Sequence, residues 1–197
     1  MAALVVGLTA CFIMGSCKSD KSSLKPNAAN QEQVEDNTVN NSSLPSTETA
    51  SVQNSLDIAP DVELTTPEGK TLKLSSLTQG KFTYIDVWAT WCRPCCQEIP
   101  FLEKLVERYK GNDKVQFLSI SIDQNKADWL KKLETDKPQW QQFIIQGETA
   151  AQFSDDWELT GIPRFIVIGP IGTIVSADAT RPSDPTTVSM IDELINN

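Results

Sequence analysis

Two cysteines separated by two residues are the part of this sequence best suited to chemistry. Cys92 and Cys95 follow the apolar run 82–88 and precede a stretch with helical periodicity. This order places the thiol pair at the N-terminus of a helix, where unpaired N–H groups and the helix dipole favour a thiolate. A pKa lowered from about 8.5 to about 7 corresponds to about 2 kcal/mol of preference for the thiolate. The sequence therefore predicts Cys92 as the attacking thiol and Cys95, one turn further and more buried, as the resolving thiol.

A Cys-x-x-Cys pair also occurs as half of a zinc site or as a structural disulfide. Zinc requires two more ligands, and the chain has no histidine and no second pair of this spacing, which leaves Cys96 or carboxylates. A structural disulfide that closes so short a loop gains little stability. The surrounding strand, tight loop with two tryptophans and helix favour a redox disulfide between Cys92 and Cys95. We expect no metal and no cofactor.

Resolution by Cys95 requires a group that accepts its proton. Asp86 interrupts the apolar run 82–88, where burial is expected to raise a carboxyl pKa. Glu98 lies three residues beyond Cys95, on the same side of the predicted helix. Asp86 and Glu98 are therefore the candidate proton acceptors. The alternatives are a buried Asp86 satisfied by backbone or water, and an exposed Glu98 without a role.

The composition excludes several classes of protein. The chain has 197 residues, five cysteines, no histidine and a net charge of −9. The acidic balance argues against a nucleic-acid partner, since phosphate binding requires basic clusters. Without histidine, Ser-His-Asp triads, Cys-His proteases and His-ligated zinc or copper sites are excluded. The length allows one domain of ordinary size plus additional material.

The N-terminal segment resembles a bacterial lipoprotein signal. Residues 2–14 are almost wholly apolar, too few for a comfortable membrane span, and two small residues then precede Cys17. We predict a signal peptide over 1–17 with lipidation of Cys17. Cys11 is the alternative lipid site, and an uncleaved anchor or a signal peptide with incidental cysteines are further alternatives. Each of these interpretations places the folded part outside the cytoplasm, in the cell envelope.

A polar segment follows the predicted signal. Residues 18–57 are rich in Ser, Asn, Thr and Gln and contain no aromatic residue. Such a segment cannot bury enough surface to offset its ordering entropy, so we predict a disordered linker. About forty flexible residues span about 35 Å, which lets a domain sample the space above a membrane. An unrecognised N-terminal subdomain is the alternative.

The remaining residues, 58–197, predict one α/β domain with a mixed central sheet. A hairpin is expected over 61–74. The other expected elements are strands at 82–88, 115–122, 143–145, 164–168 and 173–175, and helices at 92–110, 126–135, 149–157 and 185–195. The expected inward-facing residues of the first two helices are Phe101, Leu102, Leu105, Val106 and Tyr109, and Trp129, Leu130 and Leu133.

Several motifs together resemble the extracytoplasmic TlpA/ResA-like branch of the thioredoxin superfamily. They are Trp88-Ala89-Thr90-Trp91-Cys92-Arg93-Pro94-Cys95, Glu98-Ile99-Pro100, Gly161-Ile162-Pro163, Ala59-Pro60-Asp61, Gly69-Lys70 and Leu74-Ser75. The similarity covers about residues 58–197. It implies a thioredoxin fold with an N-terminal hairpin, a helix–strand insertion within 112–157, and thiol-disulfide oxidoreductase activity.

The resemblance also implies roles for single residues. Pro163 is expected to be cis and to face the cysteine pair, with the Ile162 backbone receiving the substrate chain. Trp91 is assigned to the same substrate surface. Asp86 matches the buried proton-relay aspartate of the superfamily, and Glu98 matches the active-site glutamate of the ResA-like branch.

Two residues depart from the familiar pattern. Cys96 directly follows the second active-site cysteine. It is either an inert helix thiol or a thiol that scrambles the disulfide or accepts an oxidative modification. Arg164 follows the expected cis-proline, where a small polar residue or threonine is familiar, and is expected to bias substrate charge.

The expected direction of electron flow is reduction of substrates. No histidine lies between the cysteines, and Ile162 before Pro163 resembles reducing thioredoxins. We expect a monomer that is anchored to a membrane by lipid at its N-terminal segment. The family resemblance implies recharging by a membrane thiol transporter of the CcdA or DsbD type, and action on disulfides of envelope proteins such as apocytochrome c. A peroxiredoxin-like thiol peroxidase and a non-catalytic docking module are the competing classes.

Overall fold

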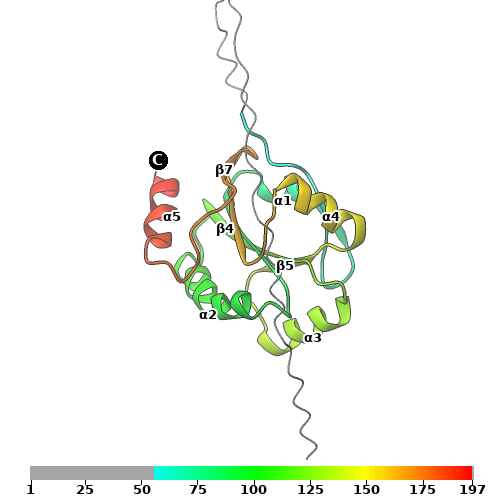
Figure 1. The fold of residues 1–197 in the computed structure, drawn as a ribbon. Coiled ribbons are helices and arrows are strands. Elements are labelled where there is room, and N and C mark those ends of the chain that lie inside the picture. The colour runs from blue at the N-terminus through cyan, green and yellow to red at the C-terminus, as the bar shows by residue number, and fades with distance from the viewer. Residues whose placement is uncertain (1–55, 197) are drawn as a thin grey trace, which may run out of the picture. The chain divides into compact units, whose positions relative to one another are not determined.

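The computed structural model describes residues 56–196 (Figure 1). Cys11, Cys17, the predicted signal peptide and nearly all of the predicted linker lie outside the described residues. The elements are β1 (Glu63–Thr65), β2 (Thr71–Lys73), α1 (Leu74–Thr78), β3 (Phe82–Trp88), α2 (Arg93–Arg108), β4 (Val115–Ser121), α3 (Lys126–Asp136), β5 (Gln141–Ile144), α4 (Gly147–Asp156), β6 (Arg164–Ile168), β7 (Ile174–Ser176) and α5 (Thr187–Asn196).

Within the described residues the strands form one mixed sheet, in the order β2-β1-β5-β4-β3-β6-β7. β3, β4 and β5 are parallel, whereas β6 and the β1–β2 hairpin are joined to this core by antiparallel pairing. β3 and β4 are therefore internal strands, which explains their almost continuous apolar sequences. The predicted α/β class with a mixed sheet, an N-terminal hairpin and an inserted helix and strand, α3 and β5, is confirmed.

Alternate residues of β3 point to opposite faces of this sheet. On one face, Tyr84 packs in a cluster with Leu102 of α2 and Ile191 of α5. On the other face, Ile85 packs in a cluster with Phe153 of α4 and with residues of α1. Figure 1 shows the same arrangement, with α2 and α5 on one side of the sheet and α1 and α4 on the other.

A third apolar cluster lies at the carboxyl end of β3, where the chain turns into α2. It contains Trp88, Cys92 and Cys95, together with Trp129 of α3 and Ile144 of β5. The inserted helix and strand therefore form one wall of the cysteine site. Among residues 56–196, no helix has the length and apolar character required to cross a membrane.

The predicted elements agree with the observed bounds to within two residues, but two side chains were wrongly predicted to face inward. Phe101 is 41% exposed, and the Lys104 ammonium lies 5.2 Å from the centre of its ring. Leu130 is 36% exposed. Each residue directly precedes or follows a buried one, Leu102 and Trp129. Neighbouring residues of a helix are about 100° apart around its axis. When Leu102 and Trp129 face the core, Phe101 and Leu130 therefore lie at the margin of the buried stripe.

Candidate active site

Cys92 and Cys95 form a disulfide with an S–S distance of 2.04 Å and a Cα–Cα distance of 5.3 Å. Cys92 is the N-cap residue of α2, and its sulfur accepts a hydrogen bond from the Cys95 N–H at 3.3 Å. Pro94 occupies the first turn, where a missing N–H is tolerated. The predicted pairing and its place at a helix N-terminus are confirmed. Both cysteines are nearly inaccessible, at 4% and 2% exposure, so capping position rather than burial distinguishes them.

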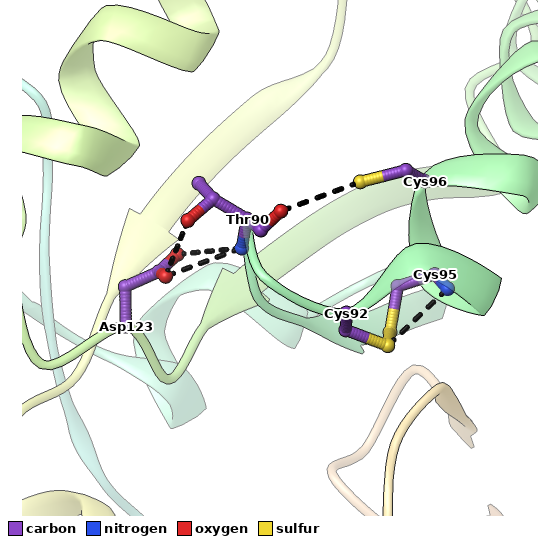
Figure 2. Close-up of a disulfide and its surroundings, with 5 residues drawn as sticks. All are labelled: Thr90, Cys92, Cys95, Cys96 and Asp123. Atoms are coloured by element: carbon purple, nitrogen blue, oxygen red, sulfur yellow. Dashed lines mark hydrogen bonds between the residues drawn. A yellow bond between two sulfur atoms is a disulfide. The ribbon is translucent and has the colours of Figure 1, made fainter. Parts of the chain in front are cut away.

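The loop that leads into Cys92 is held by a buried carboxyl group that the sequence did not single out. Asp123 follows β4 and is 2% exposed. Its oxygens accept hydrogen bonds from the Thr90 N–H at 3.2 and 3.0 Å and from the Thr90 hydroxyl at 2.7 Å (Figure 2). Ser121 donates a further bond at 2.7 Å. The carboxyl ends of adjacent parallel strands meet at one edge of the sheet, so an acid shortly after β4 is expected near the loop that follows β3. This position was the signal in the sequence from which the role of Asp123 could have been predicted.

The Cys96 thiol is half-buried and free. Its sulfur donates to the Thr90 carbonyl oxygen at 3.7 Å, and Figure 2 shows it directed away from the Cys92–Cys95 disulfide. Burial raises the pKa of this thiol, because the charged form loses hydration. Both observations favour the inert helix thiol over a thiol that exchanges with the disulfide.

The peptide bond between Ile162 and Pro163 is cis. The Ile162 side chain packs against the cluster that contains the cysteine pair, which places this loop beside the disulfide. Trp91, directly before Cys92, is 66% exposed. An exposed aromatic ring and a half-buried loop thus lie next to two nearly inaccessible sulfurs.

Arg164 does not present a free positive charge beside this loop. Its guanidinium donates to the Ala177 carbonyl at 3.2 Å and to the Thr160 hydroxyl at 3.3 Å, and lies 3.6 Å from the Asp178 carboxylate. Only 13% of the Arg164 side chain is exposed. These contacts explain Arg164 as a residue that fastens β6 to the segment after β7, and they do not support the predicted bias on substrate charge.

Asp86 is fully enclosed within the sheet, on the face that α2 covers. Its carboxyl Oδ2 accepts a hydrogen bond from the Ser119 hydroxyl at 3.0 Å. Burial raises the pKa of Asp86 to about 7; the Ser119 bond opposes this rise, and the negative charge of Glu98 adds to it. A carboxyl group with such a pKa can exchange protons at neutral pH.

Glu98 is buried on the stripe of α2 that also carries Cys95, so the alternative of an exposed helix acid is wrong. Both carboxyl oxygens are occupied by one residue: Ser183 donates its N–H to Oε2 at 3.0 Å and its hydroxyl to Oε1 at 2.9 Å. Ser183 lies in the loop before α5. Its contact with Glu98 spans 85 residues, and nothing in the local sequence marks it.

Among the described residues, no group of three or more acidic or cysteine side chains is placed to hold a metal ion. Four features of the described residues make up the candidate site. They are a disulfide at a helix N-terminus, a buried carboxyl that titrates near neutrality, a second buried carboxyl and a cis-proline loop.

Comparison with known proteins identifies relatives of this architecture. Residues 54–195 match the Redoxin family. Thiol-disulfide oxidoreductase ResA of Bacillus subtilis (strain 168) is 26% identical over 141 residues, which cover 70% of this chain and 72% of that protein.

Solved structures give the same result. A crystal structure from Bacteroides vulgatus, described as a thiol-disulfide oxidoreductase, is 38% identical with a TM-score of 0.63, and the match covers 70% of this chain and 94% of that one. A Chlorobium tepidum structure described as the thiol:disulfide interchange protein DsbE is 25% identical with a TM-score of 0.61, over 72% of this chain and 97% of that one. With its redox disulfide at the start of α2, the chain belongs to the Redoxin family and is a TlpA/ResA-like thiol-disulfide oxidoreductase of the thioredoxin superfamily.

Proposed function

We propose that this oxidoreductase works as a reductant of disulfides in envelope proteins, with Cys92 as nucleophile and Cys95 as resolving thiol. The observation that carries the proposal is the hydrogen bond from the Cys95 N–H to the Cys92 sulfur at the N-cap of α2. The same N–H remains available when the disulfide opens. Together with the helix dipole it stabilises a thiolate at Cys92, which is the attacking form.

The proposed exchange proceeds in two steps. The Cys92 thiolate attacks one sulfur of the substrate disulfide, that S–S bond breaks, and the other substrate sulfur leaves as a thiolate. Cys95, once deprotonated, attacks the Cys92 sulfur, and the second substrate sulfur leaves as the mixed disulfide breaks. Two electrons pass from the enzyme dithiol to the substrate, and the enzyme retains the Cys92–Cys95 disulfide.

Asp86 accepts the proton that Cys95 must lose in the second step. With a pKa of about 7, its carboxyl is about half ionised at neutral pH and is balanced between taking and releasing a proton. Glu98, on the same stripe of α2 as Cys95, is the second proton acceptor and also acts on Asp86 through its charge.

The substrate chain binds where the exposed Trp91 ring and the cis loop at Ile162 and Pro163 border the disulfide. The Ile162 backbone receives the extended substrate chain, and Trp91 covers apolar side chains beside the substrate disulfide. This arrangement supports recognition by backbone shape rather than by a single charged group, since Arg164 is already paired.

We further propose that the domain acts as a monomer outside the cytoplasm, anchored by lipid on Cys17 through the linker 18–57. A reductant that is oxidised at each turnover needs a source of electrons, and a membrane thiol transporter of the CcdA or DsbD type supplies them. Disulfides of apocytochrome c are the favoured substrate class. Mass spectrometry of the mature N-terminus tests the anchor: an unmodified Cys17 in an intact chain contradicts it.

The direction of electron flow is tested by insulin reduction and by the reduction potential of the Cys92–Cys95 pair. We expect insulin reduction and a potential near the roughly −270 mV of thioredoxin; a potential near the roughly −120 mV of strong periplasmic oxidants contradicts the proposal. Substrates are identified with Cys95→Ser, which accumulates mixed disulfides through Cys92. Cys96→Ser is the matched control in the same turn of α2 and is expected to trap nothing.

A further inference from the structure

We propose that Ser119 and Trp140 are positioning residues for the exchange reaction: they form a directed hydrogen-bond chain that ends on Asp86 and sets its readiness to release a proton. The inference rests on the proposed role of Asp86 as proton acceptor and names the groups that tune it. Neither residue carries a local signal in the sequence, and among the described residues neither belongs to the apolar cluster of Cys92 and Cys95.

The register of β3 and β4 brings the members of this hydrogen-bond chain together. Asp86 in β3 lies directly opposite Ser119 in β4, so both side chains project from the same face of the sheet, toward α2. The Ser119 hydroxyl donates to Asp86 Oδ2 at 3.0 Å, and the Trp140 indole N–H donates to the Ser119 oxygen at 2.8 Å. A serine hydroxyl has one proton. Since Trp140 can only donate, it occupies the Ser119 oxygen as an acceptor and leaves the Ser119 proton for Asp86.

The space beside Asp86 leaves little room for water to replace this bond. The cavity beside Asp86, which Ser119 and Trp140 also line, has a volume of about 10 Å³. That volume is at the lower limit for one water molecule. Ser119 is 1% exposed, and among the described residues its hydroxyl is the hydrogen-bond donor to the Asp86 carboxyl. An ionised Asp86 without Ser119 is therefore a buried charge without a partner, which is strongly disfavoured.

The charged groups around Asp86 do not replace Ser119. From α2, the Glu98 charge opposes ionisation of Asp86, and Cys96 is a neutral thiol with a raised pKa. From α3, Asp136 lines the same cavity and is paired with Lys132 at 2.6 Å. From β6, the residue opposite Asp86 is the uncharged Phe165.

On β3 itself, the Tyr84 hydroxyl donates to the Thr180 carbonyl at 2.6 Å and has a raised pKa, so it stays neutral. The Ser119–Trp140 chain is thus the element of this environment that favours the charged form of Asp86. Trp140 lies between α3 and β5, in the inserted segment. Through Trp140 and Ser119, this segment therefore influences the proposed proton acceptor, Asp86.

The test measures the pKa of Asp86 by carboxyl ¹³C NMR in the oxidised protein, in which Cys92 and Cys95 do not titrate. Ser119→Ala is expected to raise it by about one pH unit or more, equivalent to about 1.4 kcal/mol per unit, since the charged carboxylate loses a hydrogen bond. Trp140→Phe is expected to raise it by a smaller amount, because the Ser119 hydroxyl is no longer directed. Trp88→Phe is the matched control: Trp88 lines the same cavity, and its indole N–H has no partner among the described residues.

Two outcomes overturn the proposal: an Asp86 pKa in Ser119→Ala that does not rise, or a Trp140→Phe shift no larger than that of Trp88→Phe. A second readout separates this inference from the proposed function. In the reduced enzyme, the pH midpoint for resolution of the mixed disulfide is expected to rise with the Asp86 pKa. If the Asp86 pKa rises and the pH midpoint does not, the hydrogen-bond chain does tune Asp86, but Asp86 is not the proton acceptor.

Discussion

At Asp86, the stability of the fold and the proposed role in proton transfer oppose each other. Burial keeps its carboxyl protonated up to about pH 7, whereas the ordinary value is 3.8. Between these values the folded chain holds a proton that the unfolded chain releases, so the unfolding free energy falls as pH rises. The contribution of Asp86 is complete below about pH 4, is lost by about pH 7, and amounts to about 4 kcal/mol.

Asp86→Asn tests this linkage, because asparagine cannot titrate at the same place. We expect the oxidised variant to gain stability relative to the oxidised wild type as pH is raised from about 4 to about 8, by about 4 kcal/mol. Urea unfolding at several pH values measures the difference. Parallel pH dependences in the two proteins contradict the raised pKa. The wild type in its oxidised form is the control, since its active-site cysteines do not titrate.

The local sequence identified the site residues that form a pattern along the chain, and missed those that complete it through space. Cys92 and Cys95 are marked by their spacing, and Asp86 by its place in an apolar run. Ser119 contacts Asp86 across 33 residues, and Trp140 contacts Ser119 across 21. Such contacts depend on strand register and on the course of the insertion, which no single-sequence pattern specifies.

At the scale of elements, the loop before α2 determines where the Cys92 sulfur lies. In the oxidised protein the S–S bond also fixes this sulfur, but in the reduced protein it depends on the loop and on the Cys95 N–H. The Cys92 N–H donates to the Ala89 carbonyl at 3.1 Å, and Asp123 holds Thr90 by three hydrogen bonds. Loosening the loop should therefore affect the reduced form more than the oxidised form.

Thr90→Val removes the hydroxyl that donates to Asp123 at 2.7 Å and keeps the size of the side chain. We expect the acid dissociation constant of the Cys92 thiol to fall about threefold, equivalent to about 0.7 kcal/mol, which is part of the value of one hydrogen bond to a carboxylate. The thiolate fraction of Cys92 at pH 7 falls with it. The rate of iodoacetamide alkylation of the reduced protein measures it.

Thr90→Ser is the matched variant, because it keeps the hydroxyl and loses only a methyl group. It should alkylate at nearly the wild-type rate. If both variants slow alkylation equally, the hydroxyl bond to Asp123 has no part in placing Cys92. Urea unfolding of the oxidised proteins shows whether a general loss of stability accompanies the change.

The helices and strands were predictable from the sequence where an element buries either one face or all of its side chains. β3 and β6 were predicted with their observed bounds, since internal strands leave continuous apolar runs. Phe101 and Leu130 were misplaced because apolar character at the margin of a helical stripe does not specify which residues the neighbouring elements cover.

At the scale of the whole domain, the sheet separates two packed regions, and we propose different roles for them. Asp86, Glu98 and the residues that hold them lie on the face that α2 covers. The opposite face packs against α1 and α4, and within residues 56–196 its cluster consists of apolar residues. Neighbouring residues of β3 therefore belong to different regions: Asp86 to the side where we propose proton transfer, and Ile85 to the core beneath α4.

Ile85→Val tests this division, because it removes one methylene group from a fully buried side chain on the face away from α2. We expect the unfolding free energy of the oxidised and the reduced protein to fall by the same amount, about 1 kcal/mol. The reduction potential depends only on the difference between the two forms, so it should stay within about 10 mV of the wild type, where 30 mV corresponds to about 1.4 kcal/mol. Urea unfolding of both forms and equilibration with glutathione measure these quantities. A larger change in potential would mean that packing beneath α4 distinguishes the dithiol from the disulfide, and the sheet would then transmit the redox state to its far face.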